Sequence, residues 1–181
     1  MEVYMIRHTS VDVVQGTCYG WSDVPTAPTF EQEATLTKQR LEEILQGRPL
    51  DRVFSSPLSR ATKLAHFCGY PHPQTDDRLK EMFMGDWEMR RYDDIAREDP
   101  YILEWFDDFM HLPTTNGEGF PQFYERVASF LDELKKQPSK RVAIFAHGGV
   151  LVCGGIYAGI FPVEKAFSHQ VEYGGIQVIN L

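Results

Sequence analysis

Two histidines in this sequence each follow a short apolar run and stand beside residues suited to holding phosphate. Arg7 and His8 come directly after one run, and His147 with Gly148 comes after another. An imidazole can attack phosphorus or stabilise a phosphoryl transition state, and an arginine can hold phosphate oxygens with two charge-assisted hydrogen bonds. The amides of the helix predicted to start at Gly148 could bind an anion as well. These residue types indicate phosphoryl transfer, provided that the fold brings them together.

A second arginine and a carboxylate complete the candidate set. Arg60 lies in the segment 55–60 after a further apolar run, and Glu81 lies in the segment 79–88. A leaving alkoxide needs a proton, which a carboxyl group can donate, so Glu81 is the predicted general acid. Each feature alone also has an ordinary explanation: a solvated carboxylate, a surface Arg-His pair, a His-Gly-Gly turn, or Ser56 as the N-cap of a helix. Only the joint pattern favours catalysis.

The elements that must position these residues alternate between strands and helices. Apolar runs and helical periodicity predict strands over Val3–Ile6, Arg52–Phe54, part of 72–80, 142–145 and Ile176–Ile179. Helices are predicted over 29–46, 56–69, 123–134 and 148–158. This alternation predicts an α/β three-layer sandwich, with a mostly parallel central sheet and helices on both faces. Ligands bind beyond the carboxyl ends of such strands, where both histidines and both arginines would meet.

Residues 86–119 are rich in tryptophan, aspartate, glutamate and arginine. This composition predicts that the segment forms a lid insertion of short helices, which would contact the organic part of a substrate. Trp105, Phe106 and Phe109 in this insertion are predicted to form its core. The length of 181 residues suits a single domain over residues 1–181.

Composition and missing motifs exclude several classes of protein. A formal net charge of -8 without a basic run disfavours nucleic-acid binding, and no apolar run approaches the ~20 residues of a membrane span. Scattered cysteines and the lack of a signal-peptide pattern favour a cytoplasmic protein. There is no GxSxG, HExxH, GxGxxG or P-loop motif, and the other four histidines lack metal-ligand spacing. We therefore expect neither a metal nor a cofactor.

On these motifs the chain resembles the histidine phosphatase superfamily, in its phosphoglycerate-mutase-like branch, from Met5 to about Ile179. In that superfamily an Arg-His-Gly motif carries the phosphorylated histidine, and here Arg7-His8-Thr9 stands in its place. The second arginine, the second histidine and the proton donor of the superfamily match Arg60, His147 and Glu81. The resemblance implies hydrolysis of a small phosphorylated metabolite through a phosphohistidine at His8.

Within the superfamily the chain is most similar to the α-ribazole-5′-phosphate phosphatases of cobalamin biosynthesis, in the segments 18–25, 81–89 and 116–120. This resemblance implies that the substrate is α-ribazole 5′-phosphate. The implied substrate-binding residues are Arg7, Arg60, His147, Gly20, Glu118 and Gly148. A phosphoglycerate mutase, a broad small-molecule phosphatase and a non-catalytic phosphate-binding module stay open as alternatives, and so does a homodimer.

The chain departs from the superfamily pattern after the first histidine. Thr9 replaces a glycine, Ser10 replaces a glutamate or glutamine, and Val14 replaces an asparagine. The change at Val14 implies that one phosphate ligand is missing. The nucleophile, both arginines, the second histidine and the acid are all retained.

Overall fold

A five-stranded sheet forms the centre of the computed structural model, which describes residues 1–181 except for the side chain of Phe167. The strands are β1 (Glu2–Arg7), β2 (Arg52–Ser55), β3 (Gln74–Thr75), β4 (Arg141–Ala146) and β5 (Ile176–Asn180). Their order is β3-β2-β4-β1-β5, and only β5 runs antiparallel to its neighbour, β1. The predicted mostly parallel sheet, including an edge strand within residues 72–80, is confirmed.

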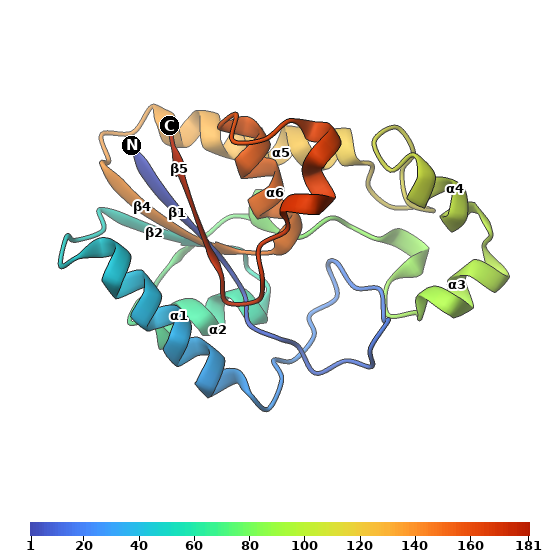
Figure 1. The fold of residues 1–181 in the computed structure, drawn as a ribbon, viewed down its shortest axis with the longest axis horizontal. Coiled ribbons are helices and arrows are strands. Elements are labelled where there is room, and N and C mark those ends of the chain that lie inside the picture. The colour runs from blue at the N-terminus through green and yellow to red at the C-terminus, as the bar shows by residue number, and fades with distance from the viewer.

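Helices cover both faces of the sheet (Figure 1). One face carries α1 (Phe30–Leu45) and α2 (Ser59–Phe67), and the other carries α5 (Phe120–Lys135) and α6 (Gly148–Tyr157). Successive strand residues point to opposite faces, so Tyr4 packs with α1 and α2 whereas Met5 packs with α5 and α6. Because both faces are buried, β1 and β4 are continuous apolar runs. The predicted three-layer sandwich is therefore confirmed.

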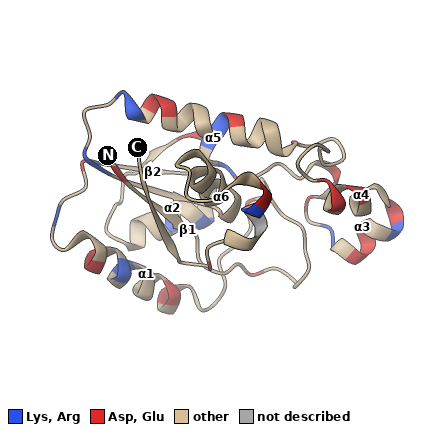
Figure 2. Ribbon diagram, turned by 45° about the horizontal axis from the view of Figure 1, so that its top comes forward, with Lys and Arg blue, Asp and Glu red and all other residues tan. Residues whose placement is uncertain are grey.

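Two further helices, α3 (Tyr92–Glu98) and α4 (Tyr101–Asp107), project at one end of the molecule (Figure 1). They are the short helices that the sequence predicts within residues 86–119. Acidic side chains are prominent on both of them (Figure 2). Three 3-10 segments link the larger elements: η1 (Asp77–Leu79), η2 (Gly85–Trp87) and η3 (Val163–His169). None of the described helices has the length and apolar character needed to cross a membrane.

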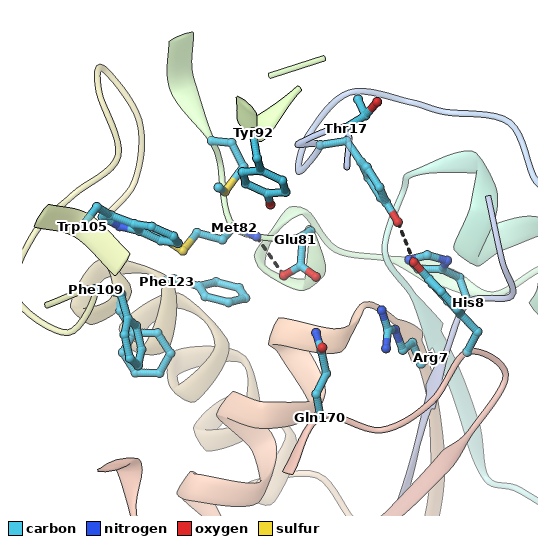
Figure 3. A pocket seen from close by; sticks show the side chains of 14 residues that line it. Arg7, His8, Thr17, Glu81, Met82, Tyr92, Trp105, Phe109, Phe123 and Gln170 are labelled. Carbon is cyan, nitrogen blue, oxygen red and sulfur yellow. Dashed lines mark hydrogen bonds between the residues drawn. The ribbon is translucent and has the colours of Figure 1, made fainter. Parts of the chain in front are cut away.

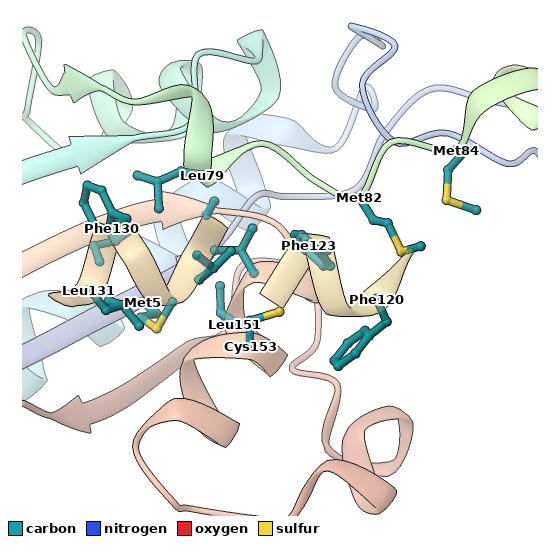
Figure 4. Packing of buried hydrophobic residues seen from close by; sticks show 14 of the residues in the cluster. Met5, Leu79, Met82, Met84, Phe120, Phe123, Phe130, Leu131, Leu151 and Cys153 are labelled. Atoms are coloured by element: carbon teal, nitrogen blue, oxygen red, sulfur yellow. The ribbon is translucent and has the colours of Figure 1, made fainter. Parts of the chain in front are cut away.

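One apolar cluster continues from the α5–α6 face of the sheet to the base of α3 and α4. Figure 4 shows its part around α5 and α6, from Phe130 to Met84. Trp87 is fully buried in it, and Ile95 and Ile102 anchor the two projecting helices there. Each such side chain contributes about 1.5–3 kcal/mol by leaving water. Met82 and Phe123 lie at the same end of the cluster, so the core of the protein also forms the wall of the candidate site.

Candidate active site

The two histidines meet at the carboxyl ends of neighbouring strands. His8 follows β1 and His147 follows β4, and the amide of His8 donates to the carbonyl of Ala146 at 3.0 Å. The centroids of the two imidazole rings lie 5.2 Å apart. His8 is 3% exposed and His147 is fully buried. The parallel pairing of β1 and β4 thus joins residues that are distant in the sequence.

The ring of His8 is oriented by its own neighbour. Its Nδ1 lies 2.7 Å from the carbonyl oxygen of Thr9, which can only accept, so Nδ1 carries the hydrogen and Nε2 keeps a free lone pair. Burial and the charge of Arg60 lower the pKa of His8 to about 3, and Arg7 acts in the same direction while the bond to Thr9 opposes it. The imidazole is therefore neutral at pH 7, as attack on phosphorus requires.

A serine supports the second histidine. His147 Nε2 lies 2.8 Å from Ser56 Oγ, and the same oxygen accepts the amide hydrogen of Leu58 at 3.3 Å. When the Ser56 hydroxyl donates to Nε2, the hydrogen of His147 lies on Nδ1, a buried atom without a described partner. The prediction that Ser56 caps a helix is wrong: α2 begins at Ser59, with Leu58 as its N-cap. Instead, the Ser56 hydroxyl forms a hydrogen bond with the ring of His147.

Main-chain carbonyls hold both arginines. Arg60 is fully buried and donates from Nη1 to the carbonyl of Ser22 at 2.9 Å and from Nη2 to that of Gly20 at 2.7 Å. Arg7 donates from Nη1 to the carbonyl of Val171 at 2.6 Å. Among the described residues, the buried Nε of each arginine has no hydrogen-bond partner. Neither guanidinium is neutralised by a carboxylate in a described ion pair, so both retain donors and charge for an anion.

Glu81 lies close to the start of α6. Its Oε1 accepts the amide hydrogen of Met82 at 3.0 Å, and its Oε2 accepts that of Gly149 at 3.1 Å (Figure 3). A Cβ atom on Gly149 would lie 2.3 Å from Glu81 Oε1, so only glycine allows this approach. The first turn of α6 therefore holds the carboxylate beside the histidines.

A cavity of about 310 Å³ opens in front of these groups (Figure 3). Its polar side includes Arg7, His8 and Glu81, and its other side is apolar and largely aromatic. The apolar and aromatic wall consists of Met82, Met84, Tyr92, Trp105, Phe109, Phe120 and Phe123. Trp105 and Phe109, predicted as lid core, thus also face a cavity that a small ligand could enter. The same prediction for Phe106 is wrong, because its side chain is 53% exposed.

Of the six predicted substrate-binding residues, only Arg7 lines this cavity. Arg60 and His147 are fully buried and lie outside its lining, and so do Gly148, Gly20 and Glu118. Gly148 lies beside Arg7, and a Cβ there would come within 3.2 Å of the guanidinium carbon. Gly20 contributes its carbonyl to Arg60. Glu118 pairs with Arg126 at 2.7 Å and lines a separate hollow. The structure thus places Gly148, Gly20 and Glu118 beside Arg7, Arg60 and Arg126 respectively, and not in the wall of the cavity.

Two supporting side chains were missed in the sequence. Arg126 donates to the main-chain carbonyls of Lys80 and Glu81, and its ion pair with Glu118 holds it in place. Glu88 accepts the amide hydrogens of the loop that carries Arg60's carbonyl partners: Gly20 at 3.1 Å, Trp21 at 2.8 Å and Ser22 at 3.0 Å. Burial raises the pKa of Glu88, but the bonds from Ser22 and these amides outweigh it and lower the pKa overall. Only folding brings these partners within reach.

The departures after the first histidine have different outcomes. Thr9 is fully buried and its Oγ1 has no partner among the described residues, so its side chain is accommodated beside His8. The amide of Ser10 donates to Glu33 at 2.8 Å. Val14 is 66% exposed and does not line the cavity. Its side chain has no polar atom, so it contributes no phosphate ligand. No cluster of metal-ligating side chains occurs among the described residues.

Residues 3–181 match the family described as the histidine phosphatase superfamily (branch 1). The chain belongs to this superfamily. A histidine at the end of the first strand, supported by a second histidine and two arginines, is the arrangement expected for a member, and the resemblance predicted from the sequence is confirmed.

Several relatives within the superfamily cover the whole chain. The adenosylcobalamin/alpha-ribazole phosphatase of Escherichia coli (strain K12) is 35% identical over 100% of this chain and 90% of its own length. The protein of the same name from Salmonella typhimurium is 33% identical over 100% of this chain and 91% of its own. The crystal structure of the alpha-ribazole phosphatase from Shigella flexneri superimposes with a TM-score of 0.88 at 29% identity, over 100% of this chain and 91% of that one.

Proposed function

We propose that this phosphatase hydrolyses α-ribazole 5′-phosphate, or a closely similar nucleotide-like monoester, through a phosphohistidine at His8. The observation that carries the proposal is the division of the cavity into a polar end, with Arg7, His8 and Glu81, and an apolar, largely aromatic end. A substrate that fits both ends needs a phosphate joined to a flat apolar group. The alpha-ribazole phosphatases similar to this chain support the same substrate class.

The chemistry of α-ribazole suits the apolar wall. Its base is a methylated benzimidazole, a flat ring system that gains free energy by leaving water against aromatic side chains. Trp105 lines this wall, and its indole N–H is buried without a hydrogen-bond partner among the described residues. A ring nitrogen of the base would provide an acceptor for it. An apolar base with one acceptor atom therefore matches the wall better than a sugar or a carboxylate.

A phosphoglycerate substrate suits the cavity less well. Its carboxylate would need a cation in addition to those that hold its phosphate. Arg7 is the only lysine or arginine among the described residues that line the cavity, and it stands at the phosphate end. This favours a nucleotide-like ester over the mutase alternative.

The first half of the proposed reaction transfers the phosphoryl group to the enzyme. Arg7, Arg60 and His147 hold the phosphoryl oxygens, and the lone pair of His8 Nε2 attacks phosphorus in line with the ester oxygen. The P–N bond forms as the P–O ester bond breaks, and Glu81 donates its proton to the leaving 5′ oxygen. The alcohol then departs.

The second half returns the enzyme to its starting state. Glu81, now a carboxylate, removes a proton from a water molecule as the water oxygen attacks phosphorus. The P–N bond breaks, inorganic phosphate forms, and His8 is again neutral with its hydrogen on Nδ1. Positive charge for both steps comes from the two arginines. In this proposal a single domain over residues 1–181 carries out both steps. The insertion over residues 86–119 contacts the organic part of the substrate.

Replacing the proposed acid tests this scheme. Glu81→Gln keeps the shape of the side chain but removes the transferable proton, so we expect the rate with alkyl phosphates to fall by roughly 100-fold or more. The loss should be much smaller with an aryl phosphate, whose phenolate leaves without protonation. Steady-state rates with both esters measure the difference. An equal rate for the variant and the parent with the alkyl ester would exclude Glu81 as the acid.

Substrate preference tests the apolar wall directly. We expect Trp105→Leu to raise KM for α-ribazole 5′-phosphate by about tenfold, because a buried aromatic contact and a donor are lost. KM for a small phosphate such as 3-phosphoglycerate should not change. Leu103→Ala is the control, because Leu103 lies on the same helix, α4, but is 56% exposed and does not line the cavity.

The same assay distinguishes the remaining alternatives. Phosphate release is measured with α-ribazole 5′-phosphate, 3-phosphoglycerate, fructose 1,6-bisphosphate and an aryl phosphate. A strong preference for the first supports the proposal, and similar rates with all four indicate a broad phosphatase. Stoichiometric binding without release would indicate a phosphate-binding module.

A further inference from the structure

Two tyrosine hydroxyls meet beside the proposed nucleophile. Tyr19 Oη and Tyr173 Oη lie 2.9 Å apart, although 154 positions separate the residues in the sequence. Both side chains line the same cavity as Arg7 and His8. The proposed reaction assigns no role to either hydroxyl.

The loop that carries Tyr173 is fixed to the end of β1. The amide of Gly174 donates to the carbonyl of His8 at 3.1 Å, and the Thr37 hydroxyl donates to the carbonyl of Gly174 at 2.9 Å. The ring of Tyr173 lies 5.6 Å from the imidazole of His8, and the guanidinium of Arg7 lies 4.1 Å from the centre of the same ring. A cation at this distance is attracted to the ring face. The phenol is therefore held against both the nucleophile and the first arginine.

Tyr19 is held from the opposite side. The amide of its neighbour Cys18 donates to the carbonyl of Arg90 at 2.8 Å. Its other neighbour, Gly20, packs so closely that a Cβ would lie 1.9 Å from the carbonyl oxygen of Met82. The guanidinium of Arg60 lies 5.4 Å from the centre of the Tyr19 ring. Each ring of the hydroxyl pair therefore lies next to one of the two arginines, Tyr173 next to Arg7 and Tyr19 next to Arg60.

A count of hydrogens leaves one donor unused in this pair. One hydroxyl donates to the other, so the accepting hydroxyl keeps its own hydrogen. Neither oxygen has another hydrogen-bond partner among the residues that the structure describes. Burial raises the pKa of Tyr19, as does its bond to Tyr173, while Arg60 and Arg7 oppose the shift. The positive charges of Arg7 and Arg60 and the unused hydroxyl hydrogen all favour binding of an anion whose oxygen accepts that hydrogen.

We propose that Tyr19 and Tyr173 form a further phosphoryl-binding element, in which the accepting hydroxyl donates to a phosphoryl oxygen held between Arg7 and Arg60. The donating hydroxyl positions its partner and makes no phosphate contact of its own. The inference rests on the proposed phosphoryl site at His8. A hydrogen bond to a charged oxygen is stronger than a neutral one, so its loss should be measurable as weaker binding of phosphoryl analogues.

The experiment uses the full chain and orthovanadate, a tetrahedral anion that becomes five-coordinate when a nucleophile binds it and then resembles a transferring phosphoryl group. Tyr19→Phe, Tyr173→Phe and the double variant are compared by their inhibition constants for vanadate, with an aryl phosphate as the reporter substrate. Each substitution keeps the ring and its contacts with the arginines. Tyr157→Phe is the matched control, because that hydroxyl bonds to Asp132 and does not line the cavity. Melting temperatures show that each variant is folded.

We expect the variant that removes the phosphate-contacting hydroxyl to raise the vanadate inhibition constant by roughly tenfold. The double variant should be no worse than the weaker-binding single variant, because the two hydroxyls act as one unit. Unchanged inhibition in all three folded variants would overturn the proposal. Faster turnover with unchanged inhibition would also overturn it, since the pair would then only restrict entry.

These outcomes are separate from the choice of substrate. Vanadate and an aryl phosphate carry no nucleoside, so the test stands even if α-ribazole 5′-phosphate proves to be a poor substrate. Failure of vanadate to inhibit the parent protein would instead overturn both the tyrosine contact and the phosphoryl site.

Discussion

His8→Ala is expected to lower the rate of phosphate release by at least about 10⁴-fold with every ester, because the substitution removes the atom that forms the covalent bond to phosphorus. The neutral state of His8 at pH 7, set by burial and by Arg60, makes it the nucleophile in our scheme. Rapid quenching during turnover should trap an acid-labile phosphoryl group on the parent protein. The variant should carry none.

Two controls accompany this substitution. His66→Ala changes a histidine that is exposed on α2 and should leave the rate unchanged. The melting temperature of His8→Ala should stay close to that of the parent, because the lost ring borders an open cavity. A folded His8→Ala protein that still turns over at the parent rate would refute the covalent mechanism.

Arg60→Met is expected to lower kcat/KM by roughly 10³-fold, the scale seen when an arginine that stabilises phosphoryl transfer is lost. It should also change the pH dependence. The charge of Arg60 helps to lower the pKa of His8, so its removal should raise that pKa from about 3 towards the ordinary value. Protonation of His8 abolishes attack, so the residual activity should begin to fall at a higher pH than in the parent.

The pH shift separates an electrostatic role from a structural one. Arg60→Lys keeps a positive charge but loses the two hydrogen bonds to the carbonyls of Gly20 and Ser22. We expect kcat/KM to fall in this variant, with little change in the pH at which activity declines on acidification. Arg52→Met, at an exposed position on β2, should change neither quantity. An Arg60→Met protein with the parent rate and pH profile would exclude Arg60 from the site.

Local rules predicted the strands, the layers and the main site residues. The apolar runs over residues 3–6 and 142–145 can only be buried as central strands, and parallel strands present their carboxyl ends at one edge. The short helices within 86–119 were predicted from the composition of that segment. The convergence of His8 and His147 therefore required only the assumption that their strands are neighbours, which the pairing of β1 with β4 confirms.

Contacts between irregular segments could not be predicted in this way. No local rule fixes the path of residues 8–29 or 170–175, so the sequence does not indicate that Tyr19 and Tyr173 meet, or that Glu88 holds the amides of Gly20 and Ser22. Ser56 shows the same limit, because its serine-proline pattern favours a helix cap whereas its neighbour in space is His147.

The sequence alone therefore determines which charged residues and candidate nucleophiles follow the strands. The reason is that short apolar runs are enough to predict which segments form buried, paired strands. The shape of the cavity, its aromatic wall and most of the hydrogen bonds that orient the candidate catalytic side chains depend on distant segments packing together. Those contacts arise only when the apolar cluster closes between the sheet and the projecting helices, so the tertiary structure decides them.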